Sequence, residues 1–214
     1  MREKGKVKEL FLEMSTAEKA KYIWEYYRYY LFAFLLVVIV TVFLVNDMGE
    51  KKEPALSIFV LGDLVDSDEI NKIAQKLNEE ILSDEERKTH EVSIQVIPYA
   101  PDAADFSMVM AALQKVTGEI STGALDVLFI DRKQFEMMNR DQYFYSQNEL
   151  VDGSLPIDEE LLFFDSKHQT TGIDISAVPL FNEAIDDSDM VMGVPVNSKK
   201  IDKTKELFNV LFMN

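Results

Sequence analysis

The sequence contains no cysteine among its 214 residues. This absence excludes disulfide bonds, zinc sites built on thiolates and cysteine nucleophiles. Histidine is almost as scarce, since His90 and His168 are the only two, and both lie in polar, loop-like contexts. A metal site that uses both is one alternative, and two surface histidines are the simpler interpretation. We therefore predict neither a metal site nor a cofactor.

Basic residues are also few, with 22 Lys and Arg against 38 Asp and Glu. Residues 1–53 hold 9 basic and 8 acidic residues, which leaves 13 and 30 for residues 54–214, a formal charge of -17. A domain this acidic lacks the basic footprint of a nucleic-acid binder, so we predict no nucleic-acid partner. The charge is explained most simply by solubility, and the alternative is an acidic recognition patch.

The motifs of common enzyme classes are missing as well. The chain has no G-x-G-x-x-G, no P-loop and no G-x-S-x-G. Its carboxylate-rich segments, DLVDSDE and DDSD, lack the glycine and the terminal glutamate of a calcium-binding loop. We predict that the protein is not an enzyme and has no catalytic residues.

One long apolar run is present, YIWEYYRYYLFAFLLVVIVTVFLV, at residues 22–45. As a helix, residues 31–45 alone would rise only about 22 Å, less than the ~30 Å of a membrane's hydrocarbon core. The tyrosines at 26–30 lengthen the run sufficiently, and no small-residue cleavage site follows it. A single transmembrane helix over residues 22–45 is therefore predicted in preference to a signal peptide or a buried helix. The predicted membrane-interface residues are Tyr22, Trp24, Tyr26, Tyr27, Arg28, Tyr29 and Tyr30.

Basic residues are concentrated before this run, and only Lys51 and Lys52 follow it closely. The positive-inside rule then predicts a single-pass protein of the cell membrane with a cytoplasmic N-terminus. The predicted organisation is a cytoplasmic tail (1–21), a transmembrane helix that contacts the lipid bilayer (22–45), a tether (46–54) and an extracytoplasmic domain (55–214).

Residues from 56 onward alternate between strand and helix patterns. LSIFVL (56–61) and LDVLFI (125–130) are continuous apolar runs, typical of strands buried on both faces, and VSIQVI (92–97) alternates apolar and polar residues. Amphipathic helices are predicted between them, over 67–81 and 106–120. This order predicts an α/β fold with one open, mainly parallel sheet whose strands start in the order 2-1-3.

The C-terminal ends of the strands are the expected ligand-binding edge of such a sheet. Asp131 lies at the end of the third strand, although a carboxylate there is also suited to capping the next helix. The residues predicted for this ligand edge are Gly62, Asp63, Tyr99, Ala100 and Asp131.

Three segments carry a resemblance to known proteins. Residues 124–150 (ALDVLFIDRKQFEMMNRDQYFYSQNEL) and 193–212 (GVPVNSKKIDKTKELFNVLF) resemble the lobe crossing and the closing strand and helix of type II extracellular solute-binding proteins. The segment KAKYIWEYYRYY is similar to the anchor entry of membrane-tethered Gram-positive proteins that bear a small solute-binding-like domain. The resemblance implies one α/β lobe, since the roughly 58 residues between the third strand and the returning strand are too few for a second.

Two functions are consistent with these features. The first is an interaction module that binds a protein partner and forms an accessory part of an envelope or membrane assembly. The alternative is a small-ligand binding or sensing domain of the solute-binding type.

Overall fold

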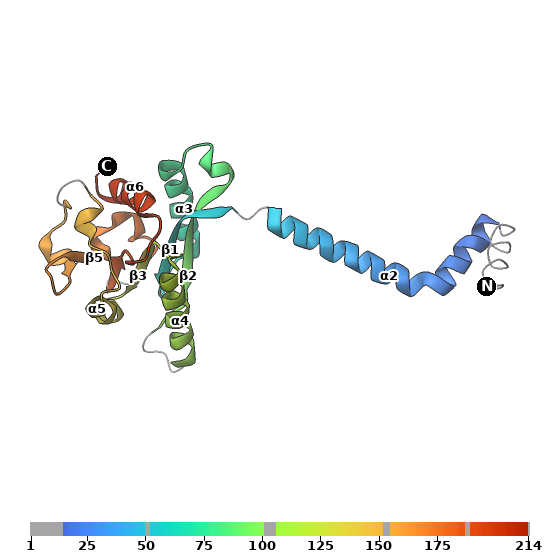
Figure 1. Cartoon of the computed structure of the whole chain (residues 1–214), viewed down its shortest axis with the longest axis horizontal. Coiled ribbons are helices and arrows are strands. Elements are labelled where there is room, and N and C mark those ends of the chain that lie inside the picture. Colours follow the sequence, from blue (N-terminus) through green and yellow to red (C-terminus); the bar gives the residue numbers. More distant parts are fainter. Residues whose placement is uncertain (1–14, 50–51, 101–105, 152–154, 187–188, 214) are drawn as a thin grey trace. The chain divides into compact units, whose positions relative to one another are not determined.

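The computed structural model describes residues 15–49, 52–100, 106–151, 155–186 and 189–213. The chain divides into two compact units, residues 1–51 and residues 52–214 (Figure 1). The first contains helix α2 (Thr16–Gly49), and the second contains the whole of the sheet. The two units are described separately below.

Helix α2 includes all seven of the predicted membrane-interface residues. In the part of the chain that the structure describes, no helix is apolar enough over a sufficient length to cross a membrane. The predicted transmembrane helix over 22–45 is therefore wrong. The physical reason lies in the tyrosine-rich segment: the apolar residues 31–45 rise only about 22 Å, and the residues added to lengthen them include Arg28. The cellular location stays a prediction from the sequence.

The second unit is built on a six-stranded sheet in the order β2-β1-β3-β6-β5-β4. Its strands are β1 (Glu53–Leu61), β2 (His90–Ile97), β3 (Val127–Asp131), β4 (Leu162–Phe164), β5 (Thr170–Asp174) and β6 (Met190–Gly193). The α-helices of this unit are α3 (Ser67–Ile81), α4 (Phe106–Thr122), α5 (Arg132–Arg140) and α6 (Ile201–Phe212). Single 3-10 turns are η1 (Glu86–Lys88), η2 (Gln147–Glu149), η3 (Glu159–Leu161), η4 (Ile175–Ala177) and η5 (Pro179–Phe181).

The sheet is mixed, which corrects the prediction of a mainly parallel one. Strands β2, β1 and β3 pair in parallel and in the predicted order 2-1-3. Strand β6, however, pairs with β3 in the antiparallel sense, and β5 and β4 continue that pattern. The reason is the connection: a parallel pair needs a crossover, usually a helix on one face, whereas β4 and β5 are joined by a short turn.

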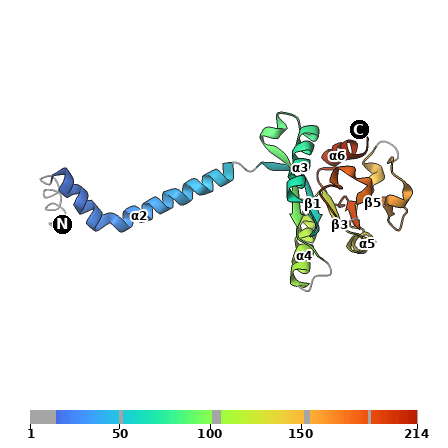
Figure 2. The same cartoon turned by 180° about the vertical axis from the view of Figure 1, so that it is seen from behind.

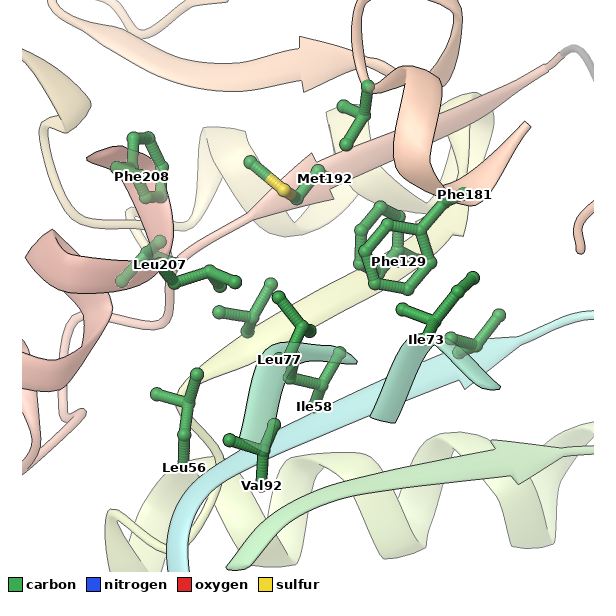
Figure 3. Packing of buried hydrophobic residues seen from close by; sticks show 14 of the residues in the cluster. Leu56, Ile58, Ile73, Leu77, Val92, Phe129, Phe181, Met192, Leu207 and Phe208 are labelled. Atoms are coloured by element: carbon green, nitrogen blue, oxygen red, sulfur yellow. The ribbon is translucent and has the colours of Figure 1, made fainter. Parts of the chain in front are cut away.

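Helices cover both faces of the sheet. Alternate residues of β1 point to opposite sides, so that Leu56, Ile58 and Val60 join one core while Phe59 and Leu61 join the other. The first core lies against α3 and α6, and the second lies against α4 and α5 (Figure 2). Residues of the first core that Figure 3 labels are Leu56, Ile58, Ile73, Leu77, Val92, Phe129, Phe181, Met192, Leu207 and Phe208.

Helix α3 forms as its sequence predicts. Ile70, Ile73, Leu77 and Ile81 make one buried stripe, while acidic and basic residues occupy the exposed face. The N-cap is Asp66, whose carboxylate accepts hydrogen bonds from the amides of Asp68 (2.8 Å) and Glu69 (3.2 Å). A carboxylate at this position satisfies amides that have no partner within the helix.

Candidate functional site

The five predicted ligand-edge residues all lie at one edge of the sheet. Gly62 and Asp63 follow β1, Tyr99 and Ala100 follow β2, and Asp131 is the last residue of β3. Because these three strands are parallel, their C-terminal ends meet, and the amide of Gly62 donates to the carbonyl of Ile97 at 3.2 Å. The five residues are thus brought together at the ends of three parallel strands, and ligand binding there stays a prediction.

Asp131 and Tyr99 form the inner part of this edge. Oδ1 of Asp131 accepts a hydrogen bond from the amide of Gln134 at 3.0 Å, which makes Asp131 the N-cap of α5. Its other oxygen, Oδ2, is buried, and no residue that the structure describes donates a well-formed hydrogen bond to it. Burial raises the pKa of the Tyr99 hydroxyl, and the nearby Asp131 carboxylate raises it further. The Tyr99 hydroxyl and the Asp131 carboxylate therefore interact at this edge.

Three further charged residues join the edge, and the sequence argument missed them. Arg132 lies next to Asp131, and its Nη2 is 2.8 Å from Oδ2 of Asp174. Its Nε is 2.9 Å from Oδ1 of Asp189, and its guanidinium lies 5.1 Å from the ring centroid of Phe163. Asp174 ends β5 and Asp189 precedes β6, so three strands contribute to this cluster.

The Asp174 carboxylate is held from two sides. It is buried, and its Oδ1 accepts hydrogen bonds from the amide (3.0 Å) and the hydroxyl (2.6 Å) of Ser176, while Arg132 occupies Oδ2. Asp174 therefore fixes the position of the guanidinium of Arg132 beside Asp131.

The edge as a whole is acidic. Asp63, Asp131, Asp174 and Asp189 lie at this edge, and Arg132 pairs with two of them, Asp174 and Asp189. Such an edge attracts cations and groups that donate hydrogen bonds, and it repels anions. Among the described residues, no group of three or more histidine, aspartate or glutamate side chains is arranged to hold a metal ion.

The two histidines do not share a site. His90 begins β2 and His168 lies in the turn between β4 and β5, and β2 and β4 are the two outermost strands of the sheet. Nε2 of His90 is 3.8 Å from Oε2 of Glu53, and His168 lies against Phe164 with ring centroids 5.9 Å apart. The alternative of one metal site formed by both is thereby excluded.

Two hollows in the described part of the second unit lie away from the ligand edge. One, of about 460 Å³, is at the opposite edge of the sheet, where β1 and β2 begin, and it is lined by Glu53, Pro54, Ala55, Glu86, His90, Lys200, Asp202 and Lys203. The other, of about 290 Å³, is lined mainly by apolar residues of the segments 156–161 and 177–179 and by the end of α6. Neither contains a predicted ligand-edge residue.

Comparisons with known proteins give one weak structural similarity. No family model matches the chain, and a search of curated proteins finds no match. Among solved structures, an ABC substrate-binding protein from Listeria monocytogenes, in complex with cycloalternan, is similar with a TM-score of 0.37 and 11% sequence identity. The match covers 57% of this chain and 28% of that protein.

Proposed function

We propose that residues 52–214 form a ligand-binding domain whose site is the C-terminal edge of the sheet. The observation that supports this most is Oδ2 of Asp131, a buried carboxylate oxygen that lies at this edge and accepts no well-formed hydrogen bond from the described residues, with the Tyr99 hydroxyl as its nearby partner. A buried acceptor without a well-formed hydrogen bond costs about 1–3 kcal/mol, so a ligand that donates a hydrogen bond to it gains that free energy.

The surrounding residues define the chemistry of the ligand. Asp63 and Asp189 add negative charge, and Arg132 is already paired with Asp174 and Asp189. An anionic ligand would face repulsion from these carboxylates. The ligand we propose is a small polar molecule rich in hydrogen-bond donors, such as ammonium or hydroxyl groups.

A thermal-shift screen of the full chain tests this proposal, with amines, amino acids and polyols as the probes. A ligand at 100 times its dissociation constant stabilises the folded state by about 2.7 kcal/mol. We expect a stabilising compound whose effect is lost in Asp131→Asn. Asparagine is also a good N-cap, so this variant should keep helix α5 and change mainly the ligand contact.

Glu91→Gln is the matched control, because Glu91 is an exposed carboxylate of β2 outside the ligand edge. Binding should persist in this variant and should be weakened in Tyr99→Phe, which removes the hydroxyl beside Asp131. The proposal is wrong if no probe stabilises the wild-type chain, or if a stabilising probe acts equally on Asp131→Asn.

A further inference from the structure

The first turn of α4 is apolar and exposed. Phe106 is 70% exposed, Met108 is 58% exposed and Met110 is 49% exposed. We call these three residues the α4 tip. In both cartoon views the start of α4 extends beyond the labelled strands (Figures 1 and 2), and residues 106–108 are all exposed, so of this turn only Val109 packs against the core.

The rest of α4 packs in the ordinary way. Val109, Ala112, Val116 and Ile120 are buried and face the second core, at the spacing of one helical face. The α4 tip is therefore not part of the stripe that holds the helix to the sheet. Large apolar side chains gathered at an exposed end of a helix are typical of an interaction surface.

The geometry of the α4 tip suits an apolar helical face. Phe106 and Met110 are four residues apart and so are neighbours along one side of the helix. Phenylalanine supplies a large rigid contact, and methionine adapts its shape to different apolar partners. Apolar side chains spaced by three and four residues on a partner helix pack against such a row.

The net negative charge of residues 54–214 favours one kind of partner for the α4 tip. Residues 54–214 carry 13 basic and 30 acidic residues, so a second copy of this chain would be repelled. The α4 tip also lies at the acidic C-terminal edge of the sheet, since α4 follows β2 and leads to β3. A basic partner would be steered toward this edge.

We infer that the α4 tip binds a basic amphipathic helix of a protein partner, with the apolar face of that helix on Phe106 and its lysines and arginines toward the acidic edge. This surface is distinct from the ligand contact proposed at Asp131. It uses the start of α4, whereas that contact uses the end of β3.

The test is fluorescence anisotropy of the full chain with a labelled model peptide of about 18 residues, made of leucine and lysine with leucine at helical spacing. We expect binding that weakens as salt rises from about 50 to 200 mM, because the charge contribution is screened. Phe106→Ser should weaken binding by about tenfold or more, the effect of removing a central aromatic contact.

Phe34→Ser is the matched control, because Phe34 on α2 is 67% exposed and nearly equal to Phe106 in this respect. It should bind the peptide as the wild type does. A glutamate-for-lysine version of the peptide should not bind. Met108→Gln provides a second variant of the α4 tip if Phe106→Ser does not fold.

The inference is wrong if the wild-type chain does not bind the leucine–lysine peptide, if Phe106→Ser and Met108→Gln both bind it unchanged, or if the glutamate peptide binds equally well. Self-association of the chain that Phe106→Ser abolishes would identify a second copy as the occupant and would also overturn it. Phe106→Ser separates the two proposals, because it should weaken peptide binding and leave the stabilisation by a small ligand in place.

Discussion

Gly172 and Gly193 are paired across β5 and β6, and they make room for an aromatic pair. The rings of Phe135 and Phe144 are stacked with centroids 4.5 Å apart. A Cβ at Gly193 would lie 2.7 Å from Cδ1 of Phe144 and 3.0 Å from Cε2 of Phe135. Contacts this short would force the two rings or the strand backbone to move. We therefore predict that Gly193→Ala destabilises the fold.

The expected magnitude follows from how firmly the rings are held. Phe135 is fully buried, and it also contacts Phe163 with centroids 5.5 Å apart, so neither ring of the stacked pair has space to move. Overpacking of this kind costs about 1–3 kcal/mol, and we expect a value in the upper half of that range. For a unit of this size each kcal/mol corresponds to about 2–4 °C in the melting temperature.

Urea unfolding followed by circular dichroism measures this loss, and Gly118→Ala is the matched control. A Cβ at Gly118 would meet no atom within 4 Å, and this glycine is exposed within helix α4. Alanine there should stabilise the protein by about 0.5–1 kcal/mol, because glycine is unfavourable inside a helix. The packing argument fails if Gly193→Ala is as stable as the wild type, or if adding Phe144→Leu recovers none of the loss.

Three other substitutions have definite expected outcomes. The amide and hydroxyl of Ser83, helped by Lys203, hold the pKa of Glu86 at about 2, below its usual 4.5. Because this pKa is lowered, ionised Glu86 stabilises the folded state above pH 4.5, and the stabilisation is lost as the pH falls toward 2. Glu86→Gln should therefore lower the melting temperature at pH 7 but not near pH 2. Arg132→Leu leaves the carboxylate of Asp174 without its cation and should lower the free energy of unfolding, measured in urea, by about 1.5–3 kcal/mol. Adding Asp174→Asn should reduce this loss. An unchanged loss in the double variant would contradict the importance of the pair. Leu77→Ala should cost about 2–5 kcal/mol by the same assay, and a loss below about 1 kcal/mol would contradict its place in the core.

Local patterns in the sequence were sufficient for the parallel half of the sheet. The segment 56–61 is apolar except for Ser57, and it forms most of β1, where it is buried on both faces. Amphipathic periodicity likewise predicted α3 and α4, because the spacing of buried residues along a helix is set by the helix itself. From these elements the order of β2, β1 and β3 followed without long-range information, and with it the meeting of their C-terminal ends.

The antiparallel half could not be predicted in this way. Strands β4 and β5 are three and five residues long, and TTGID carries little apolar signal, so their existence depends on neighbours that are distant in the sequence. The predicted transmembrane helix over 22–45 is a separate error: it lies within α2, and no described helix is apolar enough over a sufficient length to cross a membrane.

Asp131 shows most clearly which features the sequence determined and which depended on the tertiary structure. Its place after a strand indicated both a cap and an edge residue, and the structure has it as the cap of α5, with the second oxygen buried at the edge. Its neighbour Arg132 meets Asp174 across 42 residues of sequence. That contact exists only because β6 lies between β3 and β5 in the sheet, and strand pairing of this kind is decided by packing of the whole unit rather than by any local pattern.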